Sequence, residues 1–240
     1  MKERALESTQ LHDQLVPLFG RQDELRTLTA ALRVRTSCLI TGPIGIGKTR
    51  LLQESLAAAE QPFVCLERPK VLHQLLTGLA ERLSCGTGRL TSISLQARTL
   101  NALRTSPRCL ILEDVARADP RMYRFLQHVY YLPGVSLIVT SESRECLGHL
   151  RKLLWDPREQ IVLKSLTGRD ALSLFEAASA NYRLESFDLD AFRCKVLTAA
   201  RGNPGQILAM CRMASRPEYQ HGRHIKFLPL RMDALTSFVS

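Results

Sequence analysis

Residues 42–49 read Gly42-Pro43-Ile44-Gly45-Ile46-Gly47-Lys48-Thr49, which matches the pattern GxxxxGK[ST]. The run before it, residues 37–41, is short and apolar, and the segment after it, residues 49–59, is long enough for a helix. Glycines in such a loop let successive backbone N–H groups and the positive end of the next helix point at one anion. The stretch therefore predicts a strand, a phosphate-binding loop and a helix, in that order.

Two side chains of this loop have specific expected roles. Lys48 is expected to contact the β- and γ-phosphates as a point charge, and the Thr49 hydroxyl to bind magnesium. The expected nucleotide contacts comprise the whole loop and the next residue, Arg50. We therefore expect ATP and Mg²⁺ as cofactors.

An acidic pair follows a second apolar run, Cys109-Leu110-Ile111-Leu112-Glu113-Asp114. Buried carboxylates are costly at a strand end unless a metal ion or water uses them. We expect Glu113 to bind magnesium and Asp114 to polarise the attacking water, although the reverse order also fits the pattern.

Length and composition set the class of protein. A chain of 240 residues that is 45% hydrophobic can bury a full core as one or two domains, which excludes overall disorder. The uncharged apolar runs are shorter than the roughly 20 residues of a membrane-spanning helix. The charged start at residues 1–7 does not resemble a secretory signal. These features favour a soluble, cytoplasmic protein without a membrane partner.

The seven cysteines are scattered without a CxxC pair, and three lie in apolar runs. This pattern is typical of reduced thiols in a protein core, and it argues against a metal site built from cysteines.

The apolar runs are continuous rather than alternating, which is typical of strands covered on both faces. Five such runs are expected to be strands, at residues 37–41, 63–66, 109–112, 135–139 and 161–163. A first helix is expected over residues 22–34, and the later crossover helices over residues 49–59, 71–83, 95–103, 121–130 and 145–154. The pattern favours an α/β fold with a parallel, five-stranded, doubly wound sheet.

Helical patterns dominate after residue 166. Thr167 is expected to cap one helix, a second helix is expected over residues 189–199, and a third is expected to begin at Asn203-Pro204. A strand at residues 225–228 and a short helix are expected to follow. We therefore divide the chain into a P-loop core at 1–166, a small helical lid at 167–216 and a basic strand–helix extension at 217–240.

The net charge of +10 indicates an anionic partner, and most of the basic residues are arginines, which suit phosphate. From residue 191 to the end, two acidic residues stand against eight basic ones: Arg193, Lys195, Arg201, Arg212, Arg216, Arg223, Lys226 and Arg231. The lid and the tail are therefore expected to be cationic.

Several of these motifs together resemble the AAA+/STAND group of P-loop ATPases, over roughly residues 15 to 215. The resemblance rests on Phe19-Gly20-Arg21-Gln22-Asp23-Glu24-Leu25, the loop, Leu112-Glu113-Asp114-Val115, Ala118-Asp119-Pro120, Leu137-Ile138-Val139-Thr140-Ser141 and Gly202-Asn203-Pro204. It implies a P-loop NTPase fold with a lid that closes on ATP, followed by assembly with neighbouring subunits.

The resemblance also implies further site residues. The backbone at Leu18, Phe19 and Gly20 would line the adenine pocket, and Pro204 would belong to the nucleotide site as part of the GxP element. Thr140 or Ser141 would sense the γ-phosphate through the attacking water. The arginine finger would be Arg158, with Arg144 and Arg151 as alternatives. Gly205 stands where relatives carry a lid arginine, and Arg201 can substitute for it.

Other candidate sites are weaker. His221 and His224 are spaced like metal ligands on one helical face, but they have no third ligand, and solvated histidines are favoured. Tyr130, Tyr131 and Trp155 can stack on bases, although packing is the favoured interpretation for the tyrosine pair.

Three functions remain open. The first is an ATPase that acts on nucleic acid, such as duplex DNA, as a homo-oligomer and through its basic lid and tail. The second is a STAND-like regulatory switch that works through separate protein partners. The third is a binding module that retains ATP with negligible turnover.

Overall fold

The computed structural model describes residues 16–59, 62–86 and 91–239. Their contacts divide them into two compact units. The sheet unit contains the described parts of residues 23–43 and 48–163, and the helical unit contains residues 16–22, 44–47 and 164–239. The polar residues 1–7, which argued against a secretory signal, lie outside the described residues.

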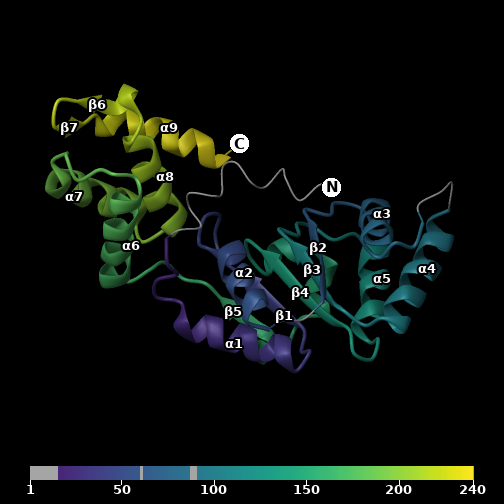
Figure 1. The fold of residues 1–240 in the computed structure, drawn as a ribbon. Coiled ribbons are helices and arrows are strands. Elements are labelled where there is room, and N and C mark those ends of the chain that lie inside the picture. Colours follow the sequence, from purple (N-terminus) through teal and green to yellow (C-terminus); the bar gives the residue numbers. More distant parts are fainter. Residues whose placement is uncertain (1–15, 60–61, 87–90, 240) are drawn as a thin grey trace. The chain divides into compact units, whose positions relative to one another are not determined.

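The sheet unit is built on five strands that pair only in parallel (Figure 1). They are β1 (Cys38–Thr41), β2 (Phe63–Glu67), β3 (Cys109–Glu113), β4 (Ser136–Ser141) and β5 (Gln160–Val162). Their order across the sheet is β2-β3-β4-β1-β5. The predicted parallel, five-stranded α/β fold is confirmed, and the ends of β1, β4 and β3 lie next to one another.

Helices accompany the sheet on both faces. They are α1 (Gln22–Arg33), α2 (Lys48–Ala59), α3 (Leu72–Arg82), α4 (Ser92–Thr105) and α5 (Pro120–Tyr130). Leu110 and Leu112 of β3 pack in a core cluster with α3, α4 and α5, while Ile111, on the opposite face, is also fully buried. Burial of successive strand residues explains why these strands read as continuous apolar runs.

The predicted helix over residues 145–154 is wrong. The segment forms two short 3₁₀ turns, η2 (Glu145–Leu147) and η3 (His149–Lys152), and η4 (Pro157–Glu159) precedes β5. The Arg117 N–H donates to the Cys146 carbonyl at 2.6 Å, and Gly148 forms a β-bridge with Ala118. These long-range backbone bonds interrupt the helix, and a local pattern does not reveal them.

The helical unit contains the three predicted lid helices, α6 (Gly168–Asn181), α7 (Leu189–Ala200) and α8 (Pro204–Ala214). Thr167 accepts a bond from the Asp170 N–H, and Asn203 accepts one from the Gln206 N–H, so both predicted caps are confirmed. The helices share a buried core to which Phe175 and Ile207 belong.

The predicted strand at residues 225–228 is wrong beyond Ile225. A small hairpin, β6 (Gln220–His221) and β7 (His224–Ile225), follows η5 (Pro217–Tyr219), and the long helix α9 (Phe227–Val239) begins directly after it. Leu230 of α9 is fully buried in the core of the helical unit. The Tyr219 hydroxyl donates to Asp233 at 2.7 Å and joins the helix to the turn. Packing on the helical core therefore extends the helix through the expected strand.

All seven cysteines are free thiols, as predicted, but they are not all in the core. Cys38 and Cys211 are buried, and burial raises the pKa of each thiol to about 12. Cys194 is exposed, so its expected core position is wrong. None of the described helices combines the length and the apolar character needed to cross a membrane.

Gly202 joins α7 to α8 and adopts a φ of +77°, a conformation that residues other than glycine rarely adopt. Its carbonyl accepts a bond from the Leu166 N–H at 2.8 Å, and a Cβ would lie 2.5 Å from the Leu166 carbonyl oxygen. We expect Gly202→Ala to lower the free energy of unfolding by about 2–4 kcal/mol, measured by urea denaturation. Gly168→Ala is the matched control, because a Cβ there meets no atom within 4 Å. Equal effects of the two substitutions would contradict the steric argument.

Candidate functional site

Lys48 is the first residue of α2 and is held by the start of its own loop. Its Nζ donates to the Gly42 carbonyl at 2.8 Å and to the Pro43 carbonyl at 3.3 Å, and the residue is 7% exposed. Burial lowers the pKa of the Lys48 ammonium, while the carboxylates of Asp114 and Glu142 act in the opposite direction. The ammonium is thus held at the loop where it is predicted to bind phosphate.

The tip of the loop, residues 44–47, is counted with the helical unit. Gly47 has φ +102°, and a Cβ there would meet no atom within 4 Å. An L-residue would be strained at this φ, and its side chain would occupy the open side of the loop. A loop of this shape, which leads into the N-terminus of α2, fits a phosphate group.

Thr49 and Glu113 are 64 positions apart in sequence and meet in the sheet unit. The Thr49 Oγ1 donates to the Glu113 Oε2 at 2.8 Å, and the Cys65 Sγ donates to the other carboxylate oxygen at 3.2 Å. A hydroxyl and a carboxylate are oxygen ligands, which Mg²⁺ prefers. The described residues contain no group of three or more His, Cys, Asp or Glu arranged for a metal. Thr49 and Glu113 would therefore hold Mg²⁺ together with phosphate oxygens and water.

Asp114 follows β3 in a strained backbone conformation, with φ +50°. Its N–H donates to the Thr140 Oγ1 at 2.9 Å, and its carboxylate lies 3.7 Å from the Arg68 Nε. The side chain is 44% exposed, so water can reach the carboxylate. Arg68 was not singled out from the sequence, because its approach depends on the pairing of β2 with β3.

Thr140 and Ser141 are both buried at the end of β4, 0% and 1% exposed. The Ser141 hydroxyl donates to the Val115 carbonyl at 2.8 Å, and the Thr140 hydroxyl accepts from Asp114. Both side chains therefore hold the turn that carries the acidic residue. Their role as γ-phosphate sensors stays a prediction.

The residues expected around adenine lie within the helical unit. Phe19 packs against its core, and a Cβ on Gly20 would lie 2.7 Å from the Asp170 side chain. Pro204 is the first residue of α8, as expected for a helix start. Arg201 is the C-cap of α7, with backbone dihedrals in the left-handed region, and its side chain is exposed. Its predicted contact with phosphate stays a prediction.

Arg21 belongs to the motif at residues 19–25, but the sequence alone assigns it no role. In the structure its side chain is buried, with 5% exposure. Its guanidinium donates to the Lys164 carbonyl and, at 3.5 Å, to the Ile46 carbonyl of the loop. A buried arginine needs partners of this kind. The available signal was its place between Gly20 and the acidic first turn of α1.

The candidate finger Arg158 is exposed and paired within its own turn. Its Nη2 lies 2.7 Å from the Asp156 Oδ2, and the side chain is 89% exposed. The alternatives Arg144 and Arg151 are also exposed. Arg50, expected near the nucleotide, forms an ion pair with Glu54 at 2.7 Å along α2.

The weaker candidates behave as surface or packing groups. His221 and His224 face each other across the β6–β7 hairpin, so their expected helical face is wrong. Tyr131 stacks edge-on against Tyr130 and is 71% exposed, and Trp155 is 65% exposed.

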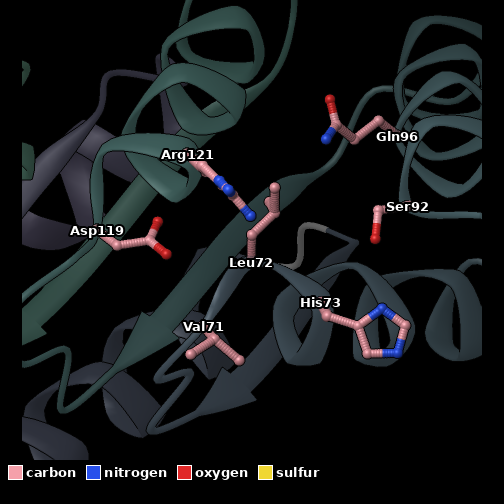
Figure 2. Close-up of a pocket in the computed structure, with 7 residues that line it drawn as sticks. All are labelled: Val71, Leu72, His73, Ser92, Gln96, Asp119 and Arg121. Carbon is pink, nitrogen blue, oxygen red and sulfur yellow. The ribbon is translucent and has the colours of Figure 1, made fainter.

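A pocket in the sheet unit lies where three helices begin (Figure 2). Val71 and Asp119 are the N-caps of α3 and α5, and Ser92 is the first residue of α4. Arg121 extends from α5 toward Leu72 in the middle of the pocket. The full lining is Val71, Leu72, His73, Ser92, Gln96, Asp119 and Arg121. Helix N-termini and an arginine favour anions, and Asp119 opposes them.

Helices α4 and α5, which both contribute to this pocket, also carry exposed arginines, whose positions the net charge alone did not indicate. The sequence has five arginines and no acidic residue between Glu81 and Glu113. Arg98 and Arg104 of α4 are exposed, as are Arg121 and Arg124 of α5. We name these four arginines the α4–α5 surface.

The sequence was compared with models of protein families. The model of the AAA ATPase domain matches residues 17–139, which is more than half of the 240-residue chain. The match includes the loop and the acidic pair, and it ends within β4.

The chain belongs to the AAA ATPase domain family.

Membership confirms the resemblance to AAA+ P-loop ATPases. A search of curated proteins finds no match to this chain.

Solved structures of other proteins share the fold of this chain at low sequence identity. The Aeropyrum pernix ORC1 protein, solved in complex with DNA, is 17% identical with a TM-score of 0.68, over 93% of this chain and 66% of that one. The Thermotoga maritima RuvB Holliday junction branch migration motor is 14% identical with a TM-score of 0.61, over 94% and 70%.

A third structure is a STAND protein with a tetratricopeptide repeat sensor, from Pyrococcus horikoshii. It is 17% identical with a TM-score of 0.54, over 93% of this chain but only 34% of that one. This chain therefore spans about one third of the STAND protein and just under two thirds of ORC1. At these identities the likeness concerns the fold alone.

Proposed function

We propose that this protein is an ATP-hydrolysing AAA+/STAND-type switch that acts on nucleic acid through nucleotide-dependent assembly. The observation that carries the nucleotide part is the hydrogen bond of 2.8 Å between Thr49 and Glu113, beside a buried Lys48. A phosphate loop and an acidic strand end that meet in this way form the parts needed for phosphoryl transfer.

Each residue then has a defined task in the proposed reaction. Lys48 binds phosphate oxygens, and Thr49 and Glu113 hold Mg²⁺, which when bound neutralises charge that develops on the phosphates. Asp114 accepts a hydrogen bond from water and orients it, because its carboxylate is partly exposed at the same strand end. Thr140 keeps Asp114 in place through the Asp114 N–H.

The nucleic-acid part of the proposal rests on charge. The net charge is +10, and exposed basic residues occur in both units, for example Arg223 and Arg231 in the tail and Arg121 and Arg124 in α5. Arginine binds phosphate in a bidentate way, and each neutralised phosphate releases counterions. ORC1 was solved with DNA, and RuvB is a Holliday junction motor, which agrees with a partner of this class.

We expect retention of duplex DNA in the presence of ATP to fall steeply with salt. The slope of log K against log salt should be about −0.9 for each phosphate contacted. Arg223→Glu with Arg231→Glu tests the tail, and Arg121→Glu with Arg124→Glu tests the α4–α5 surface. Each pair should lower retention at least tenfold if its surface binds DNA, because repulsion replaces phosphate contacts. Fluorescence anisotropy with a labelled duplex measures both effects.

The matched control is Arg26→Glu with Arg33→Glu on α1, which changes the net charge equally. If this pair weakens retention as much as the other two, overall charge explains the binding and no surface has been located. Retention that does not depend on salt would reject nucleic acid as the partner.

The alternative is a STAND-like regulator that acts on separate protein partners. It is favoured by the Gly202-Asn203-Pro204 element, in which Gly202 takes φ +77° and Pro204 starts α8. Both versions require assembly driven by nucleotide, which light scattering with ATP against ADP measures. ATP-driven assembly without any DNA retention would favour the regulator.

A further inference from the structure

The tip of the phosphate loop is anchored through three successive backbone carbonyls. The Asn203 Nδ2 donates to the Ile44 carbonyl at 2.9 Å, and the Gly205 N–H donates to the Gly45 carbonyl at 2.8 Å. The Arg21 guanidinium reaches the Ile46 carbonyl at 3.5 Å, which is a weaker contact. All these residues belong to the helical unit.

Because the peptide group is planar, these hydrogen bonds also determine where the N–H groups of the loop point. In a trans peptide, the carbonyl of one residue and the N–H of the next point in opposite directions. Carbonyls fixed at residues 44, 45 and 46 therefore direct the N–H groups of residues 45, 46 and 47 to the opposite side. Consecutive N–H groups on one side form a site for an anion.

Asn203 uses both ends of its amide at this position. The Oδ1 accepts the Gln206 N–H at 3.2 Å and caps α8, while the Nδ2 donates to the loop. The cap fixes the rotamer of the side chain, so the donor is held at the Ile44 carbonyl before any ligand arrives. An ordinary N-cap needs only the acceptor, and serine or aspartate would provide it equally well. The donor is the feature that an amide adds.

We propose that Asn203 is a positioning residue that pre-orients the backbone N–H groups of the phosphate loop for nucleotide. This inference rests on the nucleotide-binding part of the proposed function. It assigns to the lid a role at the phosphates that does not require a lid arginine. Gly205, which stands at the expected arginine position, donates its backbone N–H to the Gly45 carbonyl of the loop.

The test uses two variants that separate the cap from the donor. Asn203→Asp keeps an acceptor for the Gln206 N–H but sets a carboxylate oxygen against the Ile44 carbonyl. Asn203→Ala removes both functions. We expect both variants to bind fluorescently labelled ADP with Mg²⁺ about five- to tenfold more weakly than the wild type, as loss of one hydrogen bond predicts. Asn203→Ala should also lower the melting temperature through the loss of the cap, which Asn203→Asp keeps.

A second measurement does not depend on nucleotide. In the nucleotide-free protein, hydrogen exchange at the amides of residues 45–47 should be faster in Asn203→Asp than in the wild type, while exchange in the middle of α8 should not change. Wild-type affinity together with wild-type exchange in Asn203→Asp would overturn the inference. Failure of the wild type to bind labelled ADP would instead reject the proposed function, and faster exchange in the variant would then still report the anchoring of the loop.

Discussion

Lys48→Ala should abolish measurable nucleotide binding. Lys48 is the one cation in the loop motif, and its ammonium lies at the loop carbonyls of Gly42 and Pro43. Charge-assisted bonds contribute about 1.5–3 kcal/mol each, so the loss of contacts to two phosphates should weaken binding by about 100-fold or more. Titration with labelled ADP, in the presence of Mg²⁺, measures the change.

Lys70→Ala is the control, because Lys70 is an exposed lysine in the same unit. It should bind like the wild type. Circular dichroism must show that Lys48→Ala is folded, since the substitution leaves two loop carbonyls without their donor. A folded Lys48→Ala that binds with wild-type affinity would remove residues 42–49 from the nucleotide site.

Glu113→Gln and Asp114→Asn should leave nucleotide bound but slow its hydrolysis. A general base or a water-orienting group contributes about 10²–10⁴-fold, so we expect turnover to fall at least 100-fold in each variant. Asparagine tolerates the left-handed backbone at φ +50°, so Asp114→Asn changes the charge without adding strain. Phosphate release under single-turnover conditions measures the rate.

The dependence on Mg²⁺ separates the two roles. Glu113 contacts Thr49, so Glu113→Gln should raise the Mg²⁺ concentration needed for half-maximal turnover, whereas Asp114→Asn should not. Glu67→Gln is the control, because Glu67 is an exposed acid paired in register with Glu113 at the end of β2. If Asp114→Asn shifts the Mg²⁺ requirement and Glu113→Gln does not, the two assignments must be exchanged.

The sequence predicted the elements of the fold well where the signal is local. Thr167 and Asn203 cap their helices as expected, since a cap depends on bonds over three residues. It failed at residues 145–154, where bonds from Arg117 and Ala118 decide the backbone. It also failed at Phe227, which begins a helix because the core of the helical unit buries Leu230.

The candidate site divides in the same way. The motifs located Lys48, Thr49, Glu113 and Asp114, but they gave no role to Arg21 or Asn203 at the loop carbonyls. The contact of Asn203 with Ile44 joins residues 159 positions apart, and no spacing rule covers such a distance. The expectation that Thr140 or Ser141 senses the γ-phosphate through water stays a prediction, and the structure adds that their buried hydroxyls bind the backbone beside Asp114.

By itself, the sequence determined the phosphate loop, the acidic strand end and the alternation of strands and helices, because these depend on residue type and short-range spacing. Only the tertiary structure decided the strand order β2-β3-β4-β1-β5, the meeting of Thr49 with Glu113 and the anchoring of the loop by Asn203. These features arise when distant segments pack together, and the polar groups that become buried must then find partners across the fold.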